Sequence, residues 1–227
     1  MCSGTTAAVI LLRERSLAVG WVGDSRVVLC RDGGAIDLTA DHTLSCATER
    51  TRVASVGGTI EDVEGVSRLS GCLAVARAMG GLERATCAKL PGLSGVPDVA
   101  SQLIEPSDEF AILASDGLWD VISSQEAVAI ARAELQAYDD ATMACEKLVE
   151  TALKRHTEDN VTALVVRLNA PAASQSSRRR PRLSLQKMTP QVRAARAVPG
   201  HTAPHRAAPR RTAPHRAAPG EHRAIAL

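Results

Sequence analysis

The residues from Asp108 to Val128 read DEFAILASDGLWDVISSQEAV, and this stretch carries the strongest indication of architecture. Phe110 to Ala114 is a continuous apolar run, which predicts a strand that is covered on both faces. The sequence Ser115-Asp116-Gly117 then ends the strand at a turn. Ser123, followed by Glu126, is typical of a helix N-terminus ahead of an apolar helical stripe. The stretch therefore predicts a buried strand, an acidic turn and a capped helix in direct succession.

Four further segments have the composition of strands. Residues 17–22 and 161–166 place apolar side chains at both alternating positions, so these strands are also expected to be covered on both faces. Residues 3–12 and 26–31 complete the set. The short spacing from Asp24 to Arg26 predicts a tight antiparallel connection between the strands at 17–22 and 26–31.

Helices are expected late in the chain. The helix capped by Ser123 continues through Leu135, and residues 141–152 carry the apolar stripe of a second amphipathic helix. A weaker helix is expected over about residues 46–56, where Gly57 and Gly58 follow it. Early strands, late helices and a final strand predict an α+β domain.

Three short acidic motifs follow or precede these strands, and they contain Asp24, Asp116 with Asp120, and Asp159. If the strands at 110–114 and 161–166 are antiparallel neighbours, Asp116 and Asp159 lie at one edge of the same sheet. Converging carboxylates of this kind suit hard divalent cations such as Mg²⁺ or Mn²⁺. Each motif taken alone would be interpreted as a simple turn, because short polar side chains and glycine favour turns, and only the order and context of the three motifs together favour a site.

Charge divides the chain into two parts. The 227 residues have a net charge of +2, but residues 1–170 carry −9 and residues 171–227 carry +11. The first 169 residues are long enough for one domain with a core. Residues 170–227 contain eight of the eleven prolines and the repeat TAPHRAAPRR–TAPHRAAPGE, and no aromatic residue. This Arg/Ala/Pro-rich composition predicts a disordered basic tail.

Within this tail, Arg178 to Arg182 (RRRPR) is compatible with nuclear import or with binding to nucleic acid or another anionic surface. Biased composition without selected binding is the alternative that we favour. No aromatic residue is interspersed with the arginines, so base stacking has no support. His205 and His215 are interpreted as repeat content and not as a metal site.

Composition also excludes some classes of protein. No apolar run approaches the roughly 18 residues that cross a bilayer, and Ala7 to Leu12 is too short for a secretory signal. The six cysteines form no CxxC pair, which predicts reduced thiols and neither a zinc site nor a disulfide framework. We therefore expect an intracellular protein, cytoplasmic or nuclear, with no membrane span, and a monomer.

Taken in order, the motifs resemble those of the metal-dependent protein phosphatases of the PPM or type 2C family, over the C-terminal two thirds of their domain. The matching stretches are SGTTA at 3–7, VGDSRVVL at 22–29, LTADHTL at 38–44, GGTI at 57–60, RLSGCLAVARAMG at 68–80, PDV at 97–99, DEFAILASDGLWDVISSQEAV at 108–128 and EDNVTALVV at 158–166.

The resemblance implies an α+β sandwich of two antiparallel sheets flanked by helices, N-terminally truncated, over residues 1–169. It also implies hydrolysis of phosphoserine and phosphothreonine on phosphorylated proteins, with two Mg²⁺ or Mn²⁺ ions that activate a shared water. Asp116 and Asp159 match the aspartates that hold this pair, while Asp24 and Asp120 match positions linked to a weaker third ion. Gly117 and Asn160 are supporting residues of the same motifs.

The sequence also departs from the family pattern. The 227 residues contain no DGHGG motif and no counterpart of the family's early phosphate-binding arginine, so no catalytic general acid is assigned. Asp41-His42 lies in LTADHTL, and we interpret His42 as structural. Ala76 replaces a usual serine and Gly81 a usual aspartate, and the segment up to Pro97 is short.

These departures bear on function. Asp116 and Asp159 alone balance only half of the charge of two divalent ions, which predicts weak, single-ion binding and little catalysis. The expected function is therefore a metal-dependent serine/threonine phosphatase of reduced competence. The alternatives are a degenerate domain that binds phosphoproteins or other partners, and a tether formed by the basic tail.

Overall fold

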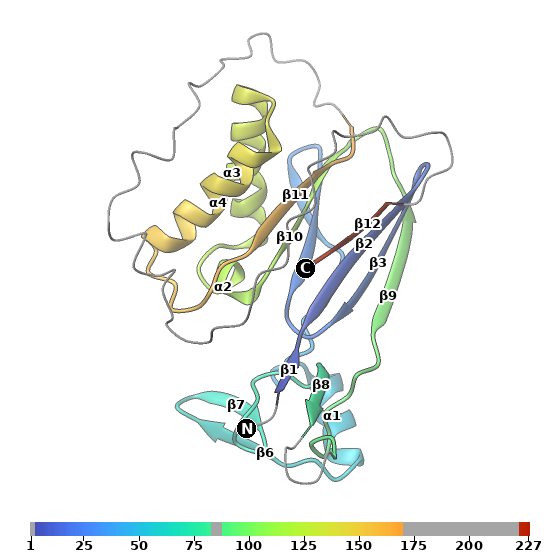
Figure 1. Cartoon of the computed structure of the whole chain (residues 1–227), viewed down its shortest axis with the longest axis vertical. Coiled ribbons are helices and arrows are strands. Elements are labelled where there is room, and N and C mark those ends of the chain that lie inside the picture. The colour runs from blue at the N-terminus through green and yellow to red at the C-terminus, as the bar shows by residue number, and fades with distance from the viewer. Residues whose placement is uncertain (1–2, 83–87, 170–222) are drawn as a thin grey trace, which may run out of the picture.

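Two four-stranded antiparallel sheets face each other in the computed structural model, which describes residues 3–82, 88–169 and 223–227 (Figure 1). The first sheet has the order β11-β10-β4-β5, formed by β4 (Arg26–Arg31), β5 (Gly34–Asp37), β10 (Asp108–Ala114) and β11 (Ala163–Arg167). The second has the order β12-β2-β3-β9, formed by β2 (Ala7–Arg13), β3 (Ser16–Val22), β9 (Asp98–Leu103) and β12 (Arg223–Ala226). This arrangement confirms the predicted α+β sandwich.

The strand β10 is the centre of the core, and every one of its residues is buried. Phe110, Ile112 and Ala114 pack with the helices, whereas Ala111 and Leu113 pack against the second sheet. Alternating side chains point to opposite faces of a strand, so a strand with layers on both sides must be apolar throughout. The apolar run at residues 110–114 is thus explained, as predicted, by burial of both faces of the strand.

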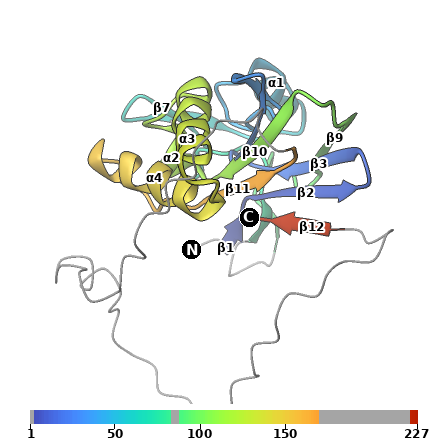
Figure 2. The same ribbon diagram turned by 90° about the horizontal axis from the view of Figure 1, so that it is seen from above.

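Three helices cover the outer face of the first sheet, α2 (Asp116–Trp119), α3 (Ser124–Tyr138) and α4 (Ala141–Lys154) (Figures 1 and 2). Ser123 caps α3, since its hydroxyl accepts a hydrogen bond from the backbone N–H of Glu126. The Glu126 carboxylate pairs with Arg155. The predicted cap is thus confirmed, while the side chain of Glu126 holds the end of α4. The second predicted helix is confirmed as α4, which buries Ala144, Leu148 and Ala152.

A smaller lobe lies at one end of the sandwich and has its own apolar core, which includes Leu44, Val53 and Leu69 (Figure 1). The expected weak helix is α1, at the predicted place. The lobe consists of α1 (Ala47–Ser55), the hairpin β6 (Ile60–Val63) and β7 (Val66–Leu69), and the pair β1 (Ser3–Thr5) and β8 (Met79–Leu82).

The connection from β3 to β4 differs from the prediction. A tight hairpin was expected, but β3 belongs to the second sheet and β4 to the first, so the hairpin prediction is wrong. β3 already has β2 and β9 as neighbours, and β4 has β5 and β10, which leaves neither strand a free edge for the other. Gly23 makes the crossover at φ +101°, a conformation that favours glycine. We call residues 23–25 the crossover.

Two strand boundaries also differ. The segment predicted as one strand over residues 3–12 is divided at Thr6, because β1 pairs with β8 in the smaller lobe while β2 pairs with β3. The last strand of the body, β11, begins at Ala163 and not at Val161. One chain segment thus serves two sheets, which a period-two pattern cannot reveal.

The end of the chain contributes β12, which pairs antiparallel with β2. The backbone N–H of Leu227 donates to the carbonyl of Ala8 over 2.8 Å. Disorder was expected for all of residues 170–227, and the structure places Arg223–Ala226 in a sheet instead. The backbone of this added strand pairs with N–H and C=O groups that the edge of β2 would otherwise leave unpaired. Residues 170–222, with Arg178 to Arg182, His205 and His215, lie outside the described residues.

Two further observations bear on the class of protein. No helix within the described ranges is long and apolar enough to cross a membrane. Within the described ranges, four cysteines are free thiols: Cys30, Cys46, Cys72 and Cys145.

Candidate metal centre

Asp116 and Asp159 lie at the same end of the first sheet. Asp116 begins α2 directly after β10, and Asp159 lies in the loop that leads to β11. The two strands are antiparallel neighbours, with Ala114 opposite Ala163, so the end of one strand is beside the start of the other. Asp116 Oδ1 accepts a hydrogen bond from the N–H of Gly117 over 2.8 Å, and Asp159 Oδ1 accepts one from Asn160 over 2.6 Å. Each carboxylate is oriented by its own turn.

The two turns are fastened to each other by short polar contacts. The Ser115 hydroxyl donates to the carbonyl of Asn160 over 3.2 Å and accepts from the N–H of Thr162 over 3.1 Å. The Thr157 hydroxyl donates to the carbonyl of Gly117 over 2.8 Å. A Cβ on Gly117 would lie 2.5 Å from the Asn160 carbonyl oxygen. Gly117 therefore permits a close approach of the two turns that any side chain would prevent.

The other two predicted carboxylates lie close enough to this pair to interact with it. Asp24 stands on the crossover, where burial first, and then Asp116, Asp41 and Asp120, raise its pKa to about 6. Asp120 follows α2, and burial, together with Asp116 and Asp159, raises its pKa as well. Crowded carboxylates that resist ionisation are characteristic of sites where a cation would relieve the repulsion. The structure thus brings the four predicted aspartates into one electrostatic group.

The donor chemistry of this group suits a hard divalent cation, because all four side chains offer carboxylate oxygens. Within the part of the chain that the structure describes, no three His, Cys, Asp or Glu side chains converge closely enough to form a complete set of ligands. Mg²⁺ usually keeps several waters and takes only one or two carboxylates from a protein. The residues fit such a partly hydrated ion better than a fully enclosed one.

A cavity of about 440 Å³ opens beside these carboxylates. Sequence reasoning did not find two of its charged residues, Arg26 and Asp41. Arg26 Nη2 donates to Asp41 Oδ2 over 2.6 Å, and its guanidinium carbon lies 5.4 Å from the centre of the Trp119 ring. The adjoining wall comes from the smaller lobe. The cavity is lined by Asp24, Arg26, Asp41, Thr43, Leu44, Ser45, Gly65, Val66, Ser67, Ala74, Asp116, Trp119 and Asp120.

His42 lies beneath the crossover and not in the cavity. Its side chain is almost fully buried, and both ring nitrogens have partners. The structural role predicted for His42 agrees with this placement. At the other departure from the family pattern, Gly81 has φ +70°, and a Cβ there would lie 2.1 Å from Leu93 Cδ2. The backbone conformation therefore favours glycine at this position, and a side chain there would have to displace the end of Leu93.

The raised pKa of Asp24 predicts a pH-dependent stability. The folded chain holds this proton more tightly than the unfolded chain, so the contribution is present at low pH and is lost as pH rises through about 6. In metal-free buffer, Asp24→Asn is expected to increase the free energy of unfolding at pH 7.5 by on the order of 2 kcal/mol, and by roughly half as much at pH 5. Urea unfolding at both pH values measures this difference.

Asp32→Asn, on the exposed turn after β4, is the matched control for this measurement. Its effect on the free energy of unfolding is expected to be smaller than about 0.5 kcal/mol at pH 7.5. If Asp24→Asn destabilises the chain at pH 7.5, burial and the neighbouring carboxylates do not oppose the ionisation of Asp24 as we expect.

Comparison with known proteins gives a consistent result. The family model "Protein phosphatase 2C" matches residues 1–161. A probable protein phosphatase 2C 27 of Oryza sativa subsp. japonica is 40% identical over 179 residues, which are 77% of this chain and 49% of that protein. A probable protein phosphatase 2C 27 of Arabidopsis thaliana is 42% identical over 169 residues, which are 72% of this chain and 42% of that protein.

A solved structure shows the same likeness. The crystal structure of serine-threonine phosphatase 2C from Toxoplasma gondii superposes with a TM-score of 0.62 at 30% identity, over 71% of this chain and 57% of that one. The chain spans about half the length of the curated relatives that it matches.

Proposed function

The chain belongs to the protein phosphatase 2C family, and we propose that it takes part in metal-dependent hydrolysis of phosphoserine and phosphothreonine esters on proteins. The observation that supports this proposal most strongly is the gathering of Asp24, Asp116, Asp120 and Asp159 at one end of the sandwich, beside a cavity of about 440 Å³. The chain spans about half the length of these relatives, so the activity of a whole protein phosphatase 2C is itself part of the proposal.

In the proposed site, Asp116 and Asp159 would hold the principal Mg²⁺ or Mn²⁺, and Asp24 and Asp120 would hold a further, weaker ion. The chemistry that such ions would supply is a lowered pKa of water and neutralisation of charge on the phosphoryl oxygens. Gly117 keeps the two principal carboxylates at a fixed spacing through its contact with Asn160. This rigidity matters, because a cation held by few carboxylates depends on their being oriented before it binds.

Other residues shape the surroundings of the substrate. The guanidinium of Arg26 is held by Asp41 and by the face of the Trp119 ring. Its positive charge therefore has a fixed position at the cavity wall. Leu44 and Val66 line the same cavity and add apolar surface to it. His42 is buried with both nitrogens engaged and is therefore not the group that protonates the leaving oxygen.

Release of phosphate from a phosphothreonine peptide tests the proposal. The purified chain is expected to release phosphate slowly in MnCl₂ and not in EDTA. Slow turnover is expected because the 227 residues contain no DGHGG stretch. Asp159→Asn is expected to lower the Mn²⁺-dependent rate at least about tenfold, since it removes one charge from the principal pair. Folded wild-type protein that releases no phosphate, or an equal rate in Asp159→Asn, would overturn the proposal.

A further inference from the structure

The crossover that carries Asp24 is held by His42, through both its ring and its backbone. The Gly23 backbone N–H donates to His42 Nδ1 over 3.1 Å, and the His42 backbone N–H donates to the Gly23 carbonyl over 2.9 Å. The imidazole also stacks on Trp21, with ring centres 5.8 Å apart and planes 11° from parallel. Gly23 therefore has both of its backbone polar groups satisfied by a single buried residue.

These contacts define the tautomer of His42. Because Nδ1 accepts the Gly23 N–H, the neutral ring carries its proton on Nε2. That nitrogen lies 3.1 Å from Asp98 Oδ2, which accepts its hydrogen bond. Partial burial opposes ionisation of Asp98, but hydrogen bonds from Arg77 and His42 outweigh it and lower the pKa of this carboxyl. The charged Asp98 thus keeps the His42 ring in the orientation that Gly23 requires.

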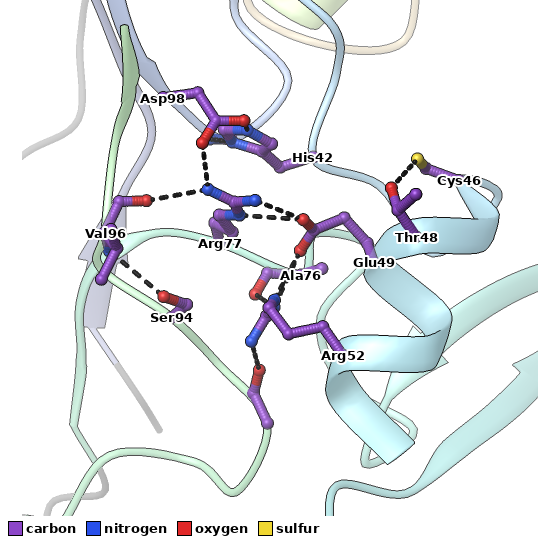
Figure 3. A network of polar contacts seen from close by, with 12 residues as sticks. His42, Cys46, Thr48, Glu49, Arg52, Ala76, Arg77, Ser94, Val96 and Asp98 are labelled. Atoms are coloured by element: carbon purple, nitrogen blue, oxygen red, sulfur yellow. Dashed lines mark hydrogen bonds and ion pairs between the residues drawn. The ribbon is translucent and has the colours of Figure 1, made fainter. Parts of the chain in front are cut away.

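Asp98 is held in turn by a chain of ion pairs that reaches α1 (Figure 3). Arg77 Nη1 donates to Asp98 Oδ1 over 2.7 Å, and Arg77 Nη2 donates to Glu49 Oε1 over 2.6 Å. Glu49 is buried and also pairs with Arg52. Arg52 Nη1 donates to the carbonyl of Gly92, and Nη2 donates to the carbonyl of Ala76. Such a fully satisfied network is stiff, since moving one member leaves a buried charge unpaired.

We propose that His42 is a positioning residue for the metal centre, which fixes the backbone next to Asp24 and is itself oriented by Asp98 and Arg77. The inference rests on the proposed role of Asp24 as a metal ligand. A partner that orients a ligand affects metal affinity although it never contacts the metal, commonly by 10–100-fold. His42 thus links the smaller lobe, which contributes Glu49 and Arg77, to the cavity at the rim.

Two substitutions of His42 distinguish the role of Nδ1 from that of Nε2. The amide oxygen of His42→Asn can reach the position of Nδ1 and accept the Gly23 N–H, whereas His42→Gln extends toward Asp98 and leaves Gly23 without an acceptor. We expect His42→Gln to weaken Mn²⁺ binding about tenfold and His42→Asn to weaken it less than threefold, measured by electron paramagnetic resonance of free Mn²⁺. Amide exchange at Gly23 is expected to accelerate in His42→Gln alone. His205→Gln, outside the described residues, is the matched control.

A third variant covers the case in which His42→Gln does not fold. The side chain of Asp98 is 46% exposed, so Asp98→Asn is expected to fold and still to weaken Mn²⁺ binding about threefold, because the ring loses its charged partner. Mn²⁺ affinity equal to that of wild type in folded His42→Gln, or in Asp98→Asn where His42→Gln does not fold, would overturn the positioning role. Wild-type protein that binds no Mn²⁺ would instead overturn the proposed metal centre, so the two failures are distinguishable.

Discussion

Asp116→Asn is expected to lower the affinity of the chain for Mn²⁺ by at least about 100-fold, which corresponds to about 2.7 kcal/mol. Asp116 is common to the whole acidic group, because its charge acts on both Asp24 and Asp120. The amide of asparagine can still accept the hydrogen bond that Asp116 Oδ1 receives from Gly117. The substitution therefore removes the charge while it keeps the turn.

The measurement is a Mn²⁺ titration of the folded protein by calorimetry, together with thermal unfolding of the metal-free protein. Loss of one charge from a crowded group relieves repulsion, so the metal-free variant is expected to be at least as stable as wild type. Asp32→Asn, on the exposed turn, is the control for a change of net charge. Mn²⁺ affinity within threefold of wild type in Asp116→Asn would show that the ion binds elsewhere.

Gly117→Ala is expected to destabilise the chain by about 2–4 kcal/mol and to weaken Mn²⁺ binding as well. The new methyl group would lie 2.5 Å from the Asn160 carbonyl oxygen, so the turn with Asp159 must move away from α2. The higher helix propensity of alanine returns about 1 kcal/mol at most, which is less than the cost of displacing the backbone. Chemical unfolding and a Mn²⁺ titration measure the two effects.

Gly20→Ala provides the matched control. A Cβ at Gly20 in β3 would meet only the Asp98 carbonyl oxygen and Val99 Cγ2, both at 3.9 Å, which is ordinary contact. This variant is expected to stay within about 0.5 kcal/mol of wild type with unchanged Mn²⁺ binding. If both alanine variants unfold at the same denaturant concentration as wild type, the close contact of Gly117 with Asn160 is not part of the folded state.

Local pattern was sufficient to predict the parts of the fold that depend on neighbours in sequence. The apolar run Phe110–Ala114, the cap at Ser123 and the stripe of α4 are each confirmed, because burial on one or two faces imposes a fixed period on the sequence. The predicted hairpin at Asp24 failed for the opposite reason. Which strand lies beside β3 depends on competition among all strands for edges, and a short connection cannot settle it.

The candidate site also contains residues that could be placed from sequence and residues that could not. Asp116 and Asp159 could be placed together from sequence, because antiparallel pairing of their two strands brings the motifs to one edge. The pair of Arg26 with Asp41 could not, although both residues lie in recognised motifs, since their contact depends on how the chain returns from β5 toward the smaller lobe. The polar network from His42 to Glu49 joins four separate segments, and no spacing in the sequence encodes it.

The crossover makes the position of the Asp24 carboxylate depend on how the two sheets pack against each other. Residues 23–25 are the short passage between the sheets, and the same peptide presents Asp24 to the rim. A displacement of one sheet against the other, or of His42 against Gly23, would also displace the Asp24 carboxylate. The metal affinity proposed for this site would therefore depend on how the sheets and the smaller lobe pack, as well as on the carboxylates themselves.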